Sequence, residues 1–418
     1  MFRKRLFTLI VVACVAFVIV PFAVNAEEKV IRIGALFPMT GRAGLYGKDS
    51  VAAAEMAIDE INAKGGVNGY KIDITFIDSK LKPAYAVRVA KRFITDDEIH
   101  FLYGVVSSGV GLALTEISKQ YKKIFVATDH ASTRLTVDSF QPYYFRVSNN
   151  TFQSMAAGAL YLKDLKKTKP WKTITYIGPD YAYGHSQFDE LKYCLDRLGV
   201  EYKIVGEYWP KIYCPDYTSY ITSIIKDNPD ILVGGFWGGD TVAFIKQAIP
   251  YGVFDKMLYL HPDAGGNYEL MSAMGTELPE GLVLSARHHN NWPDTDLNRA
   301  YVNEFYKRTG RYPTYAAEGA YAGIYFIAKA VEAVGNPDDA DALVKVMEGL
   351  KMKLPEDPEG FTSYMRPETH QIQQMQAIGV TVANDQFPPA KRMLKITNVY
   401  KAEEVAPPLE YIKKMRKQ

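Results

Sequence analysis

Short apolar runs alternate with longer amphipathic stretches through the first part of the chain. The apolar runs have strand length, and the stretches between them place apolar residues near helical spacing. The sequence predicts strands at 30–37, 65–80, 99–106 and 123–128, and helices at 50–63, 83–95 and 110–121. Repeated strand-helix alternation predicts a parallel sheet covered by helices on both faces.

The same rhythm starts again after residues 143–154. Helices are expected at 155–166, 185–198, 216–226 and 241–249, and strands at 171–180, 200–209, 229–237 and 256–263. Long helices at 297–309 and 315–334 follow, and then a late strand pair within 370–385. The fold class is therefore α/β with two Rossmann-like lobes. No low-complexity linker separates the halves, so several short ordered crossings should join the lobes across a cleft.

The first residues have the pattern of a signal peptide. Cations occupy positions 3–5, an apolar core spans 6–22, and small residues at 24–26 precede Glu27, the expected mature N-terminus. The core is short for a membrane anchor, and a lipoprotein cut at Cys14 would leave a long apolar stretch on the mature chain. We therefore expect a signal peptide at 1–26 and a periplasmic or extracytoplasmic protein.

Composition narrows the class of protein further. The formal net charge is only +2, and three of the cations lie in the signal peptide, so nothing points to nucleic acid. Two cysteines remain, Cys194 and Cys214, which flank the strand at 200–209. In an oxidising exterior they form a possible disulfide; the alternative is two unpaired thiols. No Cys/His metal spacing and no redox Cys-x-x-Cys is present, and we expect neither a metal nor a cofactor.

The glycine-rich segment 41–48 resembles a phosphate-binding loop, because it lies between a strand and a helix. A P-loop has four residues between its first Gly and the Gly-Lys pair, followed by Ser or Thr. Here five residues separate Gly41 from Gly47, and Asp49 follows Lys48, where a carboxylate would repel phosphate. The segment is interpreted as a tight turn before a helix.

In open α/β sheets, ligands bind beyond the carboxyl ends of the strands, so the loops there are the candidate sites. Ser107 and Ser108 end a strand and open a helix, where hydroxyls and free N–H groups can hold a carboxylate, although an ordinary N-cap serine would look the same. Asp129, His130 and Ala131 lie in a polar loop after the fourth strand. Adjacent Asp and His do not indicate a catalytic triad, whose members meet in space.

Aromatic residues follow two strands of the second half. Tyr181 and Tyr183 could stack on a ligand, and Phe236 and Trp237 lie among glycines that allow a close backbone approach. Packing in the core is the alternative for all four.

Asp263 also ends a strand, on a glycine-rich loop. It could pair with an ammonium group, or could satisfy its own backbone as a turn residue. The donor-rich segment 287–293 contains adjacent histidines that would point to opposite faces of a strand, so we interpret it as an interlobe crossing and not as a metal site.

Taken in order, these stretches resemble the type I periplasmic solute-binding proteins of ABC importers, the family that contains the leucine/isoleucine/valine-binding protein. The resemblance runs from about residue 30 to about 398. It rests on P-x-T-G, Y-G and E-I-N-x-K-G-G-V-N-G in family order, and then on the double serine, "STRLT", "YYFRV", "DYAYG", "NPDILVGG" and "PEG".

The resemblance implies a Venus-flytrap fold that closes on a small solute, usually an amino acid. With this fold, we expect one lobe from 27–148 and 288–368, and the other from 149–287 and 369–418. An inner-membrane ABC permease is the implied partner, and no chemistry on the ligand is expected, so the protein should not be an enzyme.

Site residues are carried over by position. The resemblance implies that Ser107 and Ser108 hold the ligand carboxylate and that the loop 129–131 lines the same site. Tyr183 would cover the ligand from the second lobe. Phe236 falls near an aromatic position, and Asp263 near the acidic residue that meets the ammonium.

The loop after the fourth strand departs from the family pattern. Branched-chain members favour a small Ser-Pro-Ala-Ala-Thr-like loop there, whereas this chain has Ala-Thr-Asp-His-Ala. A larger, polar or aromatic ligand is therefore an open alternative. A second alternative is a ligand-sensing domain for an amide or aromatic acid, with the same fold and no transport partner.

Overall fold

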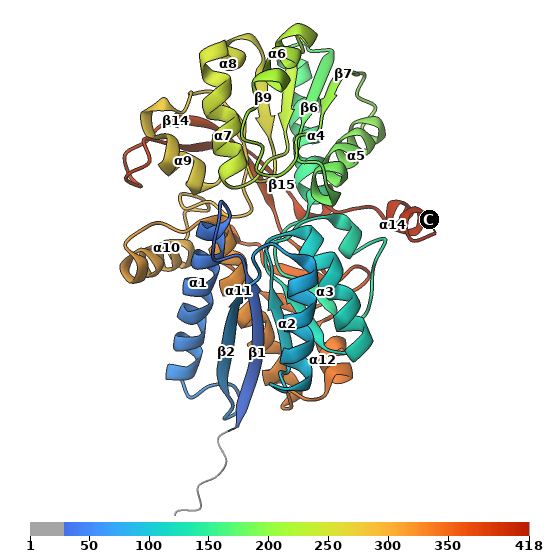
Figure 1. Cartoon of the computed structure of the whole chain (residues 1–418), viewed down its shortest axis with the longest axis vertical. Coiled ribbons are helices and arrows are strands. Elements are labelled where there is room, and N and C mark those ends of the chain that lie inside the picture. Colours follow the sequence, from blue (N-terminus) through green and yellow to red (C-terminus); the bar gives the residue numbers. More distant parts are fainter. Residues whose placement is uncertain (1–28, 418) are drawn as a thin grey trace, which may run out of the picture.

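The computed structural model describes residues 29–417, which form two lobes built on two separate sheets (Figure 1). The first lobe holds an eight-stranded sheet in the order β11-β12-β13-β5-β4-β3-β1-β2. Strands β1 to β5 are parallel, and β11 to β13 extend that sheet as an antiparallel group. The strands are β1 (Val30–Phe37), β2 (Lys71–Asp78), β3 (Phe101–Gly104), β4 (Ile124–Ala127), β5 (Tyr144–Arg146), β11 (Lys351–Met352), β12 (Ser363–Arg366) and β13 (Gln371–Gln373).

Helices cover both faces of the first sheet, as the alternation predicted. Ile33 and Phe37 of β1 belong to the apolar core that includes residues of α1 and α11, whereas Leu36 faces the core shared with α2 and α3. The helices of this lobe are α1 (Gly44–Ala63), α2 (Pro83–Thr95), α3 (Ser108–Tyr121), α10 (Asp296–Thr309), α11 (Tyr315–Val334) and α12 (Ala340–Met347), with the short 3₁₀ turn η1 (Thr133–Leu135).

The second lobe is built in the same way around a seven-stranded sheet, in the order β15-β14-β10-β9-β8-β6-β7. Its strands are β6 (Thr173–Ile177), β7 (Lys203–Tyr208), β8 (Ile231–Gly234), β9 (Leu258–His261), β10 (Val283–Leu284), β14 (Gln376–Ala383) and β15 (Arg392–Tyr400). Its helical segments are α4 (Thr151–Thr168), α5 (Ala182–Arg197), α6 (Thr218–Asp227), α7 (Gly239–Ala248), η2 (Ile249–Tyr251), α8 (Val253–Lys256), α9 (Tyr268–Met274), η3 (Gly275–Glu277), α13 (Ala402–Val405) and α14 (Leu409–Met415).

The chain crosses between the sheets three times, after β5, after β10 and after β13. The prediction of a late strand pair is wrong in one respect, because its two strands belong to different sheets. Its first strand, β13, pairs with β12 and β5 in the first sheet, while its second, β14, pairs with β10 and β15 in the second. The segment 374–375 is thus an interlobe crossing and not a hairpin turn. The precise residue boundaries of the lobes stay a prediction.

The glycine-rich segment of the first loop is largely helical. Helix α1 begins at Gly44, six residues before the predicted start at 50. A Cβ atom on Gly47 would lie 2.0 Å from the carbonyl oxygen of Pro38, so a glycine is required where the helix packs against the end of β1. The glycine therefore serves packing between helix and strand.

The possible disulfide is absent from the structure, in which Cys194 and Cys214 are free. Cys194 is buried on α5 in one apolar core of the second lobe, and Cys214 lies half-buried against another. Flanking one strand in sequence does not bring the two thiols together, because α5 and the loop before α6 pack into different cores. The predicted signal peptide lies outside the described residues. Between residues 29 and 417, no helix has both the length and the apolar character to cross a membrane.

Candidate functional site

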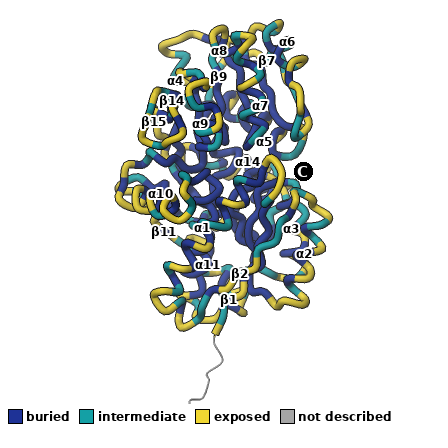
Figure 2. The backbone as a smooth tube through the Cα atoms, turned by 60° about the vertical axis from the view of Figure 1, so that its left-hand side comes forward, coloured by how far each residue is buried: buried dark blue, intermediate teal, exposed yellow. Residues whose placement is uncertain are grey.

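A small cavity of about 10 Å³ lies where the two lobes meet. The loops at the carboxyl ends of the strands supply most of its walls, as the fold predicts. The backbone around this junction is largely buried (Figure 2). The lining residues are Val106, Asp129, Ala131 and Tyr315 from the first lobe, Tyr181, Tyr183 and Trp237 from the second, and Arg287 from the crossing after β10.

Arg287 and Asp263 form a two-point ion pair on the second-lobe side of the cavity. Nε and Nη2 of Arg287 donate to the two oxygens of Asp263 at 3.2 and 3.0 Å. The hydroxyls of Tyr183 and Ser154 donate to the same carboxylate at 2.5 and 2.9 Å. Both oxygens of Asp263 therefore have two partners within the protein.

Asp129 approaches the same guanidinium from the first lobe. Nη1 of Arg287 donates to the backbone carbonyl of Asp129 at 2.5 Å and to its Oδ1. The other carboxylate oxygen, Oδ2, is buried and has no hydrogen-bond partner. Arg287, Asp263 and Asp129 together form a charged triad, and Oδ2 of Asp129 is its one polar atom without a partner. A buried carboxylate oxygen without a hydrogen bond is energetically costly.

The pKa values of the two carboxyls differ because their partners differ. Burial raises the pKa of Asp129 to about 7; Arg287 acts to lower it and the nearby Asp263 to raise it. Burial also acts to raise the pKa of Asp263, but Arg287 and the hydrogen bonds from Tyr183 and Ser154 outweigh it, and that pKa lies below its ordinary value. With both acids ionised, the triad carries one more negative than positive charge.

Aromatic rings enclose the charged triad. The Tyr315 ring lies 4.7 Å from the Arg287 guanidinium carbon, in a cation–π contact. The Trp237 indole N–H donates to the Tyr181 hydroxyl at 2.9 Å, which fixes both rings at the wall. Rings at this site favour a ligand with an apolar body.

Ser107 and Ser108 lie at the start of α3, as predicted. Ser107 is the N-cap residue, but its side chain makes no capping hydrogen bond. The Ser108 hydroxyl accepts from the backbone N–H of Ser132 at 3.1 Å, and so ties the loop after β4 to the helix. Val106 and Ala131 line the cavity at this place, and the start of α3 lies directly beside them.

His130 is placed in the core of the first lobe and does not line the cavity. Its Nδ1 lies 2.9 Å from the carbonyl of Val105, its Nε2 lies 2.9 Å from the Tyr144 hydroxyl, and its ring stacks on Phe125. Burial, with Arg146 next, lowers its pKa to about 3, so the ring is neutral.

Phe236 also packs inward, against Tyr217 and Phe244 of the second lobe. Its neighbour Trp237 occupies the cavity wall in its place. The two residues alternate between core and cavity, and periodicity could not decide which one faces the ligand.

Sequence reasoning missed the role of Arg287 and Tyr315. Arg287 lies in a crossing, as expected, and the signal that could have singled it out is the short apolar run that ends three residues before it, at Leu284 of β10. Tyr315 opens α11 far along the chain, and nothing in its local sequence connects it with Asp129. Arg146 was missed as well: its buried guanidinium donates to the carbonyls of His130 and Ser132 at 3.0 and 2.9 Å and so fixes the loop that carries Asp129.

Further hydrogen bonds join the lobes beside the cavity. The Tyr46 hydroxyl on α1 accepts from the backbone N–H of Gly238 at 3.1 Å and from the Asn267 side chain at 2.6 Å. Arg42 of the first lobe donates to Asp240 of the second at 2.9 Å. These bonds exist only when the lobes are in contact.

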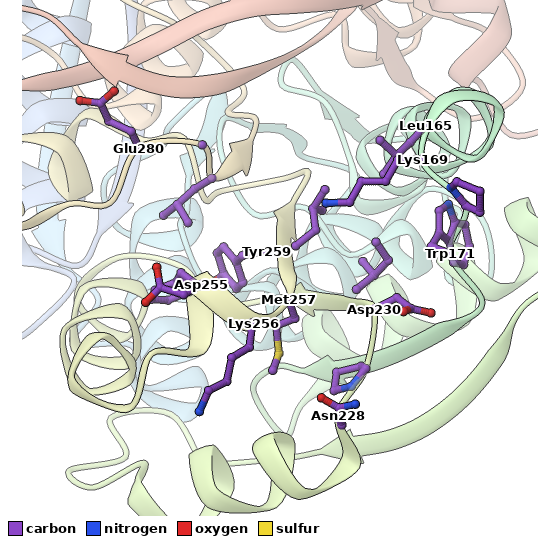
Figure 3. A pocket seen from close by; sticks show the side chains of 17 residues that line it. Leu165, Lys169, Trp171, Asn228, Asp230, Asp255, Lys256, Met257, Tyr259 and Glu280 are labelled. Carbon is purple, nitrogen blue, oxygen red and sulfur yellow. The ribbon is translucent and has the colours of Figure 1, made fainter.

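A larger hollow, of about 400 Å³, lies at the opposite ends of the second-lobe strands (Figure 3). Asp230, in its wall, accepts the backbone N–H groups of Lys172 and Thr173 at 2.7 and 2.9 Å. That carboxylate joins β6 to the loop before β8, so it serves the fold. Among residues 29–417, no three His, Cys, Asp or Glu side chains are grouped as metal ligands.

The chain belongs to the periplasmic binding protein family, whose model matches residues 30–386. It is thus a solute-binding protein of the ABC-transporter type, a class without catalytic activity, and the expected family and α/β fold are confirmed. It is 26% identical over 361 residues to Leu/Ile/Val-binding protein homolog 1 of Brucella suis, covering 84% of this chain and 89% of that one. It is 24% identical to the leucine-, isoleucine-, valine-, threonine- and alanine-binding protein of Pseudomonas aeruginosa, covering 79% and 84%.

Solved structures share the fold. A solute-binding protein of an ABC transporter from Rhodopseudomonas palustris, in complex with 3,4-dihydroxybenzoic acid, matches with a TM-score of 0.80 at 23% identity, over 90% of this chain and 98% of that one. A leucine-binding protein from Thermotoga maritima matches with a TM-score of 0.75 at 17% identity, over 90% and 100%. The relatives thus take both amino acids and aromatic acids.

Proposed function

We propose that this protein captures a small amino acid between its lobes and delivers it to an inner-membrane ABC permease. The observation that carries the choice of ligand concerns Asp129, which lines the cavity and whose buried Oδ2 has no partner. A ligand ammonium would supply three N–H donors and would neutralise the surplus negative charge of the triad. A ligand with only a carboxylate would add a second surplus charge.

The start of α3 is the proposed place for the ligand carboxylate. The first N–H groups of a helix are unpaired within the helix and favour an anion. Ser107 leaves these groups uncapped by its side chain, and Ala131 beside it adds no bulk. The carboxylate and the ammonium would then both contact the first lobe, through α3 and Asp129.

The second lobe would close over the rest of the ligand. Tyr181, Tyr183 and Trp237 present ring surface to the cavity, which suits an apolar or aromatic side chain. Because both lobes contact the ligand, binding stabilises the closed arrangement by the difference in affinity between closed and open states. The permease would then recognise the closed form.

A second candidate keeps the fold and changes the ligand and the role. The Rhodopseudomonas palustris relative holds an aromatic acid, and the rings around this cavity would suit one too. An Asp129 with a pKa of about 7 could accept a proton and tolerate such an acid. In this alternative, the protein senses an aromatic acid or amide and has no transport partner; permease and ATPase genes beside its own gene would favour transport.

Matched ligand pairs separate the two candidates. The mature protein is unfolded and refolded to remove carried-over ligand, and then screened by thermal shift with phenylalanine against 3-phenylpropanoate and with leucine against 4-methylpentanoate. A ligand at a hundred times its dissociation constant adds about 2.7 kcal/mol of stability. The proposal expects shifts only with the amino acids, and their loss in Asp129→Asn; shifts with the simple acids alone would overturn it in favour of the aromatic-acid candidate.

A further inference from the structure

A second hollow lies between the lobes, apart from the solute cavity and on the side of the molecule where α5 and α14 lie (Figure 1). Its volume is about 260 Å³. Three separate parts of the chain form its wall: the segment around η1 in the first lobe, the start of α5 in the second, and α14 at the C-terminal end. The lining residues are Thr133, Arg134, Asp138, Ala182, His185, Ser186, Asp189, Glu190, Tyr411 and Met415.

Glu190 is the unusual group in this hollow. Its side chain is only 3% exposed, and its Oε2 is buried without a hydrogen-bond partner. Burial raises its pKa to about 8, although the hydroxyls of Thr151 and Thr133 act to lower it. A buried carboxyl oxygen without a partner, in the wall of an open hollow, indicates a missing donor.

The other charges around the hollow do not supply that donor. Arg134 lies 3.7 Å from Asp138, and the imidazole of His185 lies 2.9 Å from Asp180. Asp189 is paired with Lys192 at 3.1 Å at the exposed rim. Asp138 and Asp189 thus each have a cationic partner, and Glu190 is the carboxyl group of the wall that has none, so the occupant that would pair with it is a cation.

The hollow is separate from the solute cavity. The hydroxyls of Ser132 and Ser186, one from each lobe, lie 2.8 Å apart, and Ser186 also borders the hollow. The two spaces have no lining residue in common. An occupant of the hollow would therefore bind together with the solute and would not compete with it.

We propose that this hollow binds a small organic cation, a primary ammonium or guanidinium group that donates to Glu190. A metal ion is disfavoured, because among residues 29–417 no three His, Cys, Asp or Glu side chains, those of this wall included, are grouped closely enough to hold one. An ammonium on a short alkyl chain fits the rest of the wall, where Tyr411 and Met415 add apolar surface.

The position of the hollow couples this site to lobe closure. Helix α14 follows the second sheet, yet Arg416 just after it lies over the Phe140 ring of the first lobe at 4.2 Å. Since both lobes supply the wall, the cation binds the closed form better than the open form. By linkage, it raises the affinity for the solute, and the solute raises the affinity for the cation by the same factor.

The probe is n-butylammonium chloride, with 1-butanol as the neutral control. Binding to the full mature protein is followed by saturation-transfer NMR at pH 8.5, where Glu190 is largely ionised. The experiment uses the Asp129→Asn background, so that the solute cavity does not contribute. Glu190→Gln is the test variant, and Asp164→Asn, an exposed acid on α4 away from the hollow, is the matched control. Glu190→Gln keeps the shape of the side chain, and its melting temperature verifies folding.

The proposal expects millimolar or tighter binding of butylammonium, at least a tenfold loss in Glu190→Gln, a smaller loss in Asp138→Asn, and no loss in Asp164→Asn. It further expects butylammonium to tighten solute binding in the Asp129-containing protein, and not in its Glu190→Gln variant. Equal binding of 1-butanol would overturn the proposal, as would undiminished binding in Glu190→Gln or no binding of the amine at 20 mM (roughly the upper limit of a specific weak site). An outcome that overturns the cation site would not contradict the proposed solute binding, because solute binding is tested separately with Asp129→Asn.

Discussion

Arg287 donates from Nε and Nη2 to the two oxygens of Asp263, and both side chains are buried. The acid that the family resemblance assigns to the ligand ammonium is thus already paired within the protein. The acid that still has an unpartnered oxygen, Oδ2, stands on the other lobe, at Asp129. This exchange of roles moves the expected cation contact from the second lobe to the first.

Removing Arg287 should destabilise the protein strongly. Arg287→Ala leaves two buried carboxylates without their cation, and breaking a buried ion pair from one side costs about 3–5 kcal/mol. Urea unfolding of the ligand-free protein measures the change. The control is Arg299→Gln, which removes an exposed arginine that pairs with two exposed aspartates and should cost less than about 1 kcal/mol. A loss equal to the control would mean that the triad is not formed in solution.

Solute affinity should depend on pH through Asp129. Its pKa of about 7 in the ligand-free protein means that it is largely protonated at pH 5.5, whereas an ammonium needs the ionised form. Affinity for an amino acid should therefore rise with pH, by up to about tenfold per unit below pH 7, and level off above it. Calorimetry in two buffers of different ionisation enthalpy would detect the proton released on binding. In Asp129→Asn, any weak binding that remains should not vary with pH. In the parent protein, an affinity that falls with rising pH would indicate an anionic ligand.

Tyr46→Phe should weaken solute binding without changing any cavity wall. The hydroxyl joins α1 to Gly238 and Asn267 of the second lobe, and these bonds exist only in the closed arrangement. Their loss leaves buried donors unpaired, and the dissociation constant should rise about tenfold. Tyr306→Phe, at an exposed tyrosine on α10, is the control. Equal affinities in both variants would show that this contact does not hold the lobes together.

Two buried acids, Glu318 and Glu356, make stability pH-dependent. Burial raises the pKa of Glu318 to about 7, with Asp357 adding to the shift and the contact with Glu356 opposing it. The folded state thus prefers the protonated acid, and this contribution is full below about pH 4.5 and lost as pH rises towards 7. Glu318→Gln should therefore be more stable than the parent at pH 8, by roughly 1–3 kcal/mol, with the gain shrinking below pH 5.

Thermal unfolding across this pH range tests the pair. Glu332→Gln, an exposed position on the same helix, provides the control and should show no such gain. A gain that is the same at pH 5 and pH 8 would assign the effect to packing and not to ionisation.

The two thiols should titrate as free cysteines. Cys214 is half-buried and should react with a thiol reagent in the native protein within minutes, whereas Cys194 is buried and should react only on unfolding. Burial raises the pKa of the Cys194 thiol, which slows it further. A reducing agent should leave the melting temperature unchanged; a drop would reveal a bridge after all.

The fold could be predicted from the sequence because its elements are locally encoded. The predicted helices 83–95 and 315–334 coincide with α2 and α11, where apolar spacing and an N-terminal boundary agree. The β14 strand was found too, but not its sheet, because pairing between distant segments leaves no local pattern. The early start of α1 at Gly44 has a local reason: Gly44 and Gly47 in its first turn are poor helix formers and indicate a loop.

The site could be predicted only as a set of loops. The sequence placed Asp129, Tyr183 and Asp263 at strand ends, and the structure brings all three together. It could not tell which of two adjacent side chains faces the cavity, as Phe236 and Trp237 illustrate. Nor could it pair Arg287 with acids that lie 24 and 158 positions away in the chain.

The three crossings make each lobe a mosaic of distant segments. A chain that ends at residue 350 would lack three strands of the first sheet and two of the second. Neither sheet can be completed until nearly the whole polypeptide has been made, so no contiguous fragment corresponds to one lobe. Recombination at a single breakpoint between two related genes therefore cannot exchange one lobe alone, because each sheet contains segments from both sides of the breakpoint. The residues of both lobes that set ligand specificity should for this reason be exchanged only together.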